Sequence, residues 1–190
     1  MAANTTGRLL VASPQIRDGF FDRSVVFMLH HDEMGALGVI ISRPTGLEIE
    51  ELLPRWAPLT LEPAVVFDGG PVEPNGFIGV ARGVDGADFD DDDDAIATPV
   101  GPGDLVTVDL DADPALAATM VDRLRIFRGY SGWAPGQLEG ELNRGGWFII
   151  DADVGDLWSE DPATLYETVL RRQEGELRWF ANVPDDPSLN

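Results

Sequence analysis

The stretch Phe127–Trp147, "FRGYSGWAPGQLEGELNRGGW", mixes glycines with large aromatic side chains and then changes to a helical pattern. Glycine lets the backbone turn where other residues cannot, and Tyr130 and Trp133 are large enough to anchor such a turn. The segment from Pro135 to Gly145 has the pattern of an amphipathic helix. The stretch therefore predicts a short strand, a sharp corner and a helix in succession.

Outside this stretch the sequence predicts more strands than helices. Helical patterns cover residues 45–56, 111–127 and 159–173, and the last two have an Asp-Pro start, at Asp113 and Asp161. Apolar and β-branched runs predict strands at 8–12, near 25–30, at 36–44, at 105–110 and at 147–153, with two more in 64–82. Several of these strands are joined as hairpins, which favours a mixed α+β fold over a parallel array.

The chain shows no internal repeat and no linker, so we expect a single domain over residues 1–190. Aspartates crowd the segment from Asp85 to Asp94, which predicts a solvated acidic loop near 85–104. The last residues, 184–190, have the composition of a frayed tail.

Composition excludes several kinds of chemistry. The chain has no cysteine, and its 13 basic residues are all arginine. Disulfides, thiolate ligands and reactions that need a lysine are therefore excluded. The net charge of −21 argues against direct nucleic-acid binding, because phosphate contacts need positive charge. With no apolar run of membrane-span length and no signal-peptide pattern, the sequence predicts a cytoplasmic protein without membrane contact.

Tests for catalytic motifs give little. His30 and His31 are neighbours in a predicted strand and so point to opposite faces, where they cannot share a metal ion. The "GYSGW" run places Ser131 like the nucleophile of a G-x-S-x-G elbow, but Trp133 replaces the last glycine, and no histidine follows residue 31. We therefore expect no metal and no cofactor.

Candidate ligand-binding residues come from the two glycine-rich segments and from the first histidine. Gly69 and Gly70 are predicted to form a tight turn with positive φ, with an anion nest as the alternative. Gln137, Glu139 and Glu141 fall on the predicted helix, where the Gln137 amide could face a ligand. The candidates are Tyr130, Ser131, Trp133, Gln137, Glu139, Gly69, Gly70 and His30. A purely structural role for the corner remains the alternative.

Three segments together, "GYSGWAPGQLEGEL" (129–142), "FDGGPV" (67–72) and residues 9–44, resemble the YqgE/AlgH family of uncharacterised bacterial proteins. The resemblance implies an α+β fold with a mixed, largely antiparallel, bifurcated sheet that partly closes into a barrel, surrounded by helices. It carries no catalytic residue over to this chain. This sequence departs from the family pattern in the acidic insertion after Arg82 and in Pro135.

Three functional hypotheses remain. The first is a non-enzymatic binding or regulatory module that acts through a protein partner or a small ligand. The second is a hydrolase or transferase that uses Asp18, Asp68 or Glu139 with His30, with or without Mg²⁺. The third is a transcriptional regulator, a role to which one branch of the family owes its name, although the charge argues against direct DNA binding.

Overall fold

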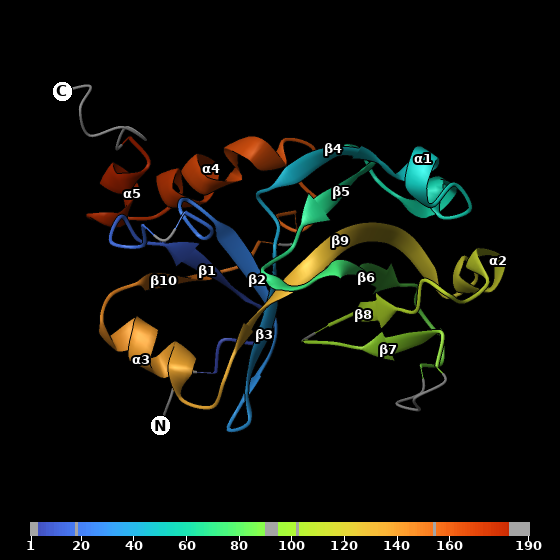
Figure 1. Ribbon diagram of the computed structural model, residues 1–190, viewed down its shortest axis with the longest axis horizontal. Helices are drawn as coiled ribbons and strands as arrows, with labels where there is room; N and C mark the ends of the chain where they lie inside the picture. Colours follow the sequence, from blue (N-terminus) through green and yellow to red (C-terminus); the bar gives the residue numbers. More distant parts are fainter. Residues whose placement is uncertain (1–3, 18, 90–94, 102, 154, 183–190) are drawn as a thin grey trace.

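The structure is a computed structural model that describes residues 4–17, 19–89, 95–101, 103–153 and 155–182 (Figure 1). The predicted tail at 184–190, part of the acidic loop and Asp18 lie outside these residues. The strands are β1 (Arg8–Ala12), β2 (Val25–Asp32), β3 (Gly35–Ile40), β4 (Pro44–Glu48), β5 (Val65–Asp68), β6 (Val72–Gly83), β7 (Ala97–Pro99), β8 (Leu105–Val108), β9 (Val121–Trp133) and β10 (Trp147–Asp151). The helices are α1 (Ile49–Leu52), α2 (Pro114–Ala117), α3 (Gln137–Asn143), α4 (Leu165–Arg171) and α5 (Leu177–Phe180), with 3₁₀ turns at Ala57–Leu59 and Pro162–Thr164.

Strand β9 runs from α2 at one end of the molecule to β3 near its centre and joins two lobes (Figure 1). The main path of the sheet runs β10-β1-β2-β3-β9-β6-β8-β7. On one edge, β9 pairs antiparallel with β6 from Val121 to Tyr130. On its other edge, β5 pairs with it in parallel at Phe127 and Arg128, and β3 pairs antiparallel further along, from Ser131. The sheet therefore forks along β9, which confirms the predicted bifurcated, largely antiparallel α+β fold.

Glycines permit this fork because two backbones pass in direct contact there. A Cβ on Gly70 would lie 2.0 Å from the carbonyl carbon of Tyr130, and one on Gly69 would lie 2.4 Å from the carbonyl oxygen of Gly129. Gly129 itself has a φ of 64°. The prediction of positive φ is wrong for Gly69, whose role is to allow this close approach.

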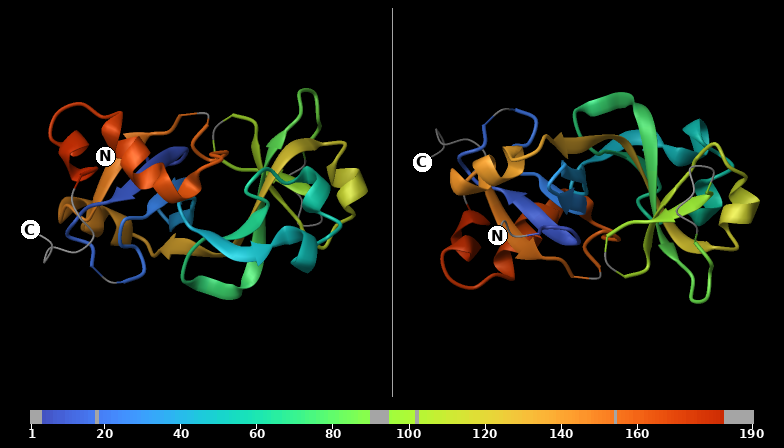
Figure 2. Two further views of the ribbon diagram at one scale, coloured as in Figure 1. Left: turned by 90° about the horizontal axis from the view of Figure 1, so that it is seen from above. Right: turned by 90° about the horizontal axis from the view of Figure 1, so that it is seen from below.

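The buried apolar residues form three clusters, and the views from above and from below show the two lobes side by side (Figure 2). The cluster under α4 extends across β5, β6 and β9 through Phe67, Val80 and Phe127. In the first lobe, one face of β1–β3 packs on α4 and the other on α3. Alternate residues of β1 divide between them: Leu9 faces α4, and Leu10 faces α3. The third cluster lies in the second lobe, between β5–β9, α1 and α2, and includes Ile126 and Val66.

The helix predicted over 111–127 is wrong beyond its first turn. Asp113 caps α2 as expected, because its carboxylate accepts the N–H of Ala115 at 3.1 Å. The chain then enters β9 at Val121, since this segment pairs along the whole of β6. Helical propensity is a weak preference that such pairing overrides.

The other three helix predictions also need correction at their starts. Residues 45–56 form β4 and then only the single turn of α1, which ends before Pro54 as expected. Asp161 precedes a 3₁₀ turn, and its carboxylate accepts the hydroxyl of Thr164 rather than a backbone N–H. The helix predicted from Pro135 begins at Gln137.

One arginine lies inside the core. Arg125 of β9 is 2% exposed, and its guanidinium lies 4.5 Å from the ring centroid of Phe67. Its Nη2 donates to the carbonyl oxygens of Glu62 and Ser159, at 3.3 and 2.9 Å. Burial lowers the pKa of Arg125 to about 10. This side chain therefore ties two loops from distant parts of the sequence to the central strand.

No helix in the described part of the chain combines the length and the apolar character that a membrane crossing requires.

Candidate functional site

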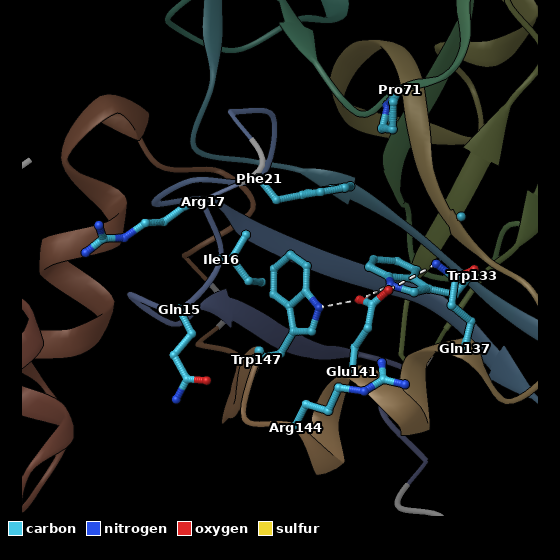
Figure 3. A pocket seen from close by; sticks show the side chains of 12 residues that line it. Gln15, Ile16, Arg17, Phe21, Pro71, Trp133, Gln137, Glu141, Arg144 and Trp147 are labelled. Carbon is cyan, nitrogen blue, oxygen red and sulfur yellow. Dashed lines mark hydrogen bonds between the residues drawn. The ribbon is translucent and has the colours of Figure 1, made fainter.

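A cavity of about 520 Å³ lies beside α3 in the first lobe (Figure 3). This volume falls within the range of small-molecule sites. Its walls come from the loop before β2, the ends of β9 and β10, and α3. The residues that line it are Gln15, Ile16, Arg17, Phe21, Pro71, Gly132, Trp133, Gln137, Glu141, Arg144, Gly146 and Trp147. We call this cavity the aromatic pocket.

Three aromatic rings pack together on one side of the aromatic pocket. Trp133 ends β9 and Trp147 begins β10, and their ring centroids lie 5.9 Å apart with the planes nearly perpendicular. Phe21 packs against both, 6.2 Å from Trp133 and 5.4 Å from Trp147. The two indoles are only 6% and 4% exposed, so they are held in place by the core. This wall is apolar and already formed.

Glu141 carries the polar part of the pocket. Its Oε2 accepts the indole N–H of Trp133 at 2.9 Å and that of Trp147 at 2.8 Å. Its Oε1 accepts the side-chain amide of Gln137 at 3.0 Å, because residues four apart share a helix face. The carbonyl oxygen of the same Gln137 accepts the backbone N–H of Ala134 and so fixes the start of α3. The carboxylate is thus oriented by three donors (Figure 3).

A second hollow, of about 460 Å³, lies on the side of the β2–β3 hairpin. His30 and Tyr130 line it, and Gly132 and Trp133 line both hollows. His30 Nε2 lies 2.9 Å from a carboxylate oxygen of Asp32, and this hydrogen bond holds the pKa of Asp32 below its usual value. The hairpin hollow therefore presents one exposed imidazole–carboxylate pair.

His31 faces the opposite way, as expected for adjacent strand residues, and is buried. The backbone N–H of Thr5 donates to its Nδ1 at 3.2 Å, so Nδ1 is an acceptor. Its Nε2 therefore carries the proton and donates to Glu139, at 3.2 Å. The ring links the start of the chain to α3. Thr5 and His31 are buried, whereas the Glu139 side chain is 31% exposed.

Glu139 gives the site a testable pH dependence. Its own backbone N–H, and then His31, hold the pKa of Glu139 below its ordinary value of 4.5, although burial acts the other way. A carboxylate whose pKa is lower in the folded than in the unfolded state stabilises the fold at any pH above its unfolded-state pKa. This contribution is lost as the pH falls through the folded-state pKa. We expect wild type to keep its advantage over Glu139→Gln in urea unfolding above the ordinary value of 4.5 and to lose this advantage as the pH falls below it. A difference that stays constant to the lower pH would contradict this assignment, and the exposed Glu174→Gln serves as the control.

The structure divides the predicted site residues among four places. Trp133 and Gln137 line the aromatic pocket, and His30 and Tyr130 line the hairpin hollow. Glu139 binds His31. The remaining three, Gly69, Gly70 and Ser131, lie at the fork of the sheet, where the Ser131 hydroxyl donates to the carbonyl of Gly69 at 3.1 Å. Ser131 is fully buried, so its hydroxyl makes a structural contact and is not exposed as a nucleophile would be.

Sequence reasoning missed most of the aromatic pocket. Phe21 and Trp147 are not among the candidates. Two tryptophans, Trp133 and Trp147, flank the helix segment in the sequence, and in the structure their rings pack together. Arg144 was missed as well. The available signal was the spacing of Gln137 and Glu141, which places both side chains on one face of α3.

The described candidates of the catalytic alternative contact different partners. His30 pairs with Asp32, while Asp68 lies 3.6 Å from Arg128 and Glu139 contacts the other histidine. Among the residues that the structure describes, no group of three or more histidine, aspartate or glutamate side chains is arranged to hold a metal ion.

Comparisons with known proteins agree over the whole chain. A family described as AlgH-like matches residues 9–178. A UPF0301 protein of Streptomyces avermitilis is 47% identical, over 99% of this chain and 96% of its own length. A UPF0301 protein of Mycobacterium leprae is 41% identical, over 97% of this chain and 90% of its own.

Two solved structures share the fold. A crystal structure of a Corynebacterium diphtheriae protein has a TM-score of 0.83 at 30% identity and covers 94% of this chain and 92% of its own. The solution structure of the AlgH protein from Pseudomonas aeruginosa has a TM-score of 0.70 at 27% identity, covering 98% and 97%. The glycine-rich fork, the corner and α3 all lie within the matched residues, and the chain belongs to the AlgH-like family.

Proposed function

We propose that this protein is a non-enzymatic binding module whose small ligand occupies the aromatic pocket. The observation that carries the proposal is the combination of a cavity of about 520 Å³ with an apolar wall and one oriented carboxylate. Ligand sites are typically concave and mostly apolar, with a few polar groups that fix orientation. Regulation through a protein partner would then follow from ligand occupancy.

Preorganisation supports the proposal. The buried indoles of Trp133 and Trp147 are held both by ring packing and by their hydrogen bonds to Glu141. A ligand that enters such a site does not have to order these side chains, which is a large part of the usual cost of binding. A core that only filled space would not leave a cavity of this size beside three fixed donors.

The positions of the titratable groups favour binding over catalysis. A catalytic acid or base must lie within hydrogen-bond reach of the reacting group. In the aromatic pocket, Glu141 already accepts three hydrogen bonds, and neither histidine is among the lining residues. The imidazole of His30 lies in the hairpin hollow with Asp32 as its partner.

The test is a fragment screen followed by nuclear magnetic resonance of the indole N–H groups. We expect ligands to shift the signals of Trp133 and Trp147 and to leave that of Trp179, which is 73% exposed and outside the pocket. Glu141→Gln should weaken the best fragment by about tenfold, because an amide cannot accept all three donors. Glu174→Gln, on an exposed loop, is the matched control.

Two results would contradict the proposal. The first is a library in which no fragment moves either pocket indole. The second is a bound fragment whose affinity is the same in wild type and Glu141→Gln while the indole signals of the variant remain dispersed as in a folded protein.

A further inference from the structure

We propose that the ligand of the aromatic pocket is a small planar organic anion, and that Arg144 binds its charged group. This inference rests on the proposed function and adds the chemical class of the ligand. It follows from the charges around the cavity, from the hydrogen bonds that Glu141 already accepts and from the position of Arg144.

The charges that line the aromatic pocket run against those of the chain. The protein carries a net charge of −21, yet the lining residues include two arginines, Arg17 and Arg144, and one carboxylate, Glu141. A locally positive cavity in a strongly acidic protein attracts anions, because low-dielectric walls focus the local field.

Glu141 has little capacity left to attract a cation. A carboxylate offers about four acceptor positions, and the two indoles and Gln137 occupy three of those of Glu141. Three N–H dipoles directed at its oxygens offset its negative charge locally. The carboxylate therefore acts as a brace for the aromatic wall, and the charge that remains available to a ligand is positive.

Arg144 is better placed than Arg17 to supply that charge. It follows the end of α3, and its guanidinium folds back over Gly140, whose missing side chain leaves room for it: a Cβ there would lie 3.7 Å from Nη1. Within the described residues the side chain of Arg144 makes no hydrogen bond or ion pair, although its backbone N–H donates to the carbonyl of Gly140. Arg17 instead points away from the cavity, and its Nε donates to the carbonyl of Pro14 (Figure 3).

The apolar body of the ligand follows from the wall opposite. Phe21, the exposed edges of the indoles of Trp133 and Trp147, and Ile16 form an apolar surface on this side of the cavity. A flat ring system stacks on such a surface, and a cavity of about 520 Å³ accommodates two fused rings. The guanidinium is planar and binds a carboxylate or a phosphate with two parallel hydrogen bonds.

Three probes with one ring system and three charges test this inference: 1-naphthaleneacetate, 1-naphthaleneacetamide and 2-(1-naphthyl)ethylamine. Titrations followed by the indole signals of Trp133 and Trp147 give their dissociation constants. We expect the acetate to bind about tenfold more tightly than the amide, and the amine to bind more weakly than both. Arg144→Gln should remove the advantage of the acetate and change the affinity of the amide by less than about twofold.

Arg171→Gln is the matched control, because it removes the same charge from an exposed position on α4 outside the pocket. An amide or amine that binds wild type as tightly as the acetate overturns the inference and leaves the proposed function standing. An acetate advantage that survives in Arg144→Gln overturns the role of that residue. If none of the three probes moves either indole while neutral or cationic fragments do, the ligand class is wrong; if nothing does, the proposed function itself fails.

Discussion

Replacing Gly70 with alanine should prevent this protein from folding. The added Cβ would lie 2.0 Å from the carbonyl carbon of Tyr130, 2.1 Å from its oxygen and 2.3 Å from the backbone nitrogen of Ser131. Backbone atoms cannot move aside as a flexible side chain can, so the two strands at the fork must separate. We expect a loss of more than about 4 kcal/mol in the free energy of unfolding, which is most of the stability of a typical domain.

The measurement is urea unfolding followed by circular dichroism, together with the yield of soluble protein. Gly46→Ala is the control, because this exposed glycine of β4 has no atom within 4 Å of an added Cβ. It should change the free energy of unfolding by less than about 1 kcal/mol. If Gly70→Ala unfolded at the same urea concentration as Gly46→Ala, the close contact at the fork would be wrong.

The second large effect is expected at Arg125. Alanine there leaves a cavity beside Phe67 and removes the donors to the carbonyl oxygens of Glu62 and Ser159. Large-to-small changes of this kind cost about 3–5 kcal/mol. Thermal and urea unfolding of Arg125→Ala should therefore show a loss of this size.

Arg125→Met separates packing from charge. The fall in the pKa of Arg125 from its ordinary value to about 10 corresponds to a cost of roughly 3 kcal/mol for keeping the buried guanidinium charged. Methionine fills much of the same volume without that cost, and buried ionic groups are often replaced by apolar ones with little loss. We expect Arg125→Met to recover at least half of the loss seen in Arg125→Ala. Equal losses in the two variants would show that the hydrogen bonds, and not the packing, hold the loops.

The lowered pKa of Arg125 also makes the free energy of unfolding depend on pH. Because the pKa of Arg125 is lowered in the folded protein, the folded state releases this proton first as the pH rises. This free-energy penalty is therefore constant below about pH 10 and decreases as the pH rises from there towards the pKa of the unfolded state. At neutral pH, the comparison of Arg125→Met with wild type contains the whole penalty.

Local patterns predict most of the strands and the α+β class, because a hairpin turn and the alternation of residues along a strand are encoded within a few residues. The helix expected at 111–127 failed for the opposite reason. Its Asp113-Pro114 start is a local signal and is correct, but the segment from Val121 is a strand only because β6 lies beside it. Pairing between segments about 40 residues apart leaves no trace in either segment alone.

The candidate site shows the same division. Trp133 and Gln137 were found because they belong to one short motif, and they do line the aromatic pocket. Phe21 and Arg144 belong to segments far from each other in sequence, and only the folded sheet brings them to one cavity. The sequence places the two histidines on opposite faces of β2. It does not show which face is buried, because apolar residues occur on both.

Strand β9, which is common to both lobes, also determines when the chain can fold during its synthesis. The hairpin of β2 and β3 leaves the ribosome early, but β3 pairs with the last residues of β9, and β1 pairs with β10. Some 90 residues separate the end of β3 at Ile40 from its partner at Ser131, which corresponds to roughly 5–20 s of translation. Throughout this interval the apolar faces of β1–β3 have neither their sheet partners nor α3 and α4 to cover them. The nascent chain is therefore expected to need protection from aggregation until its last third has emerged.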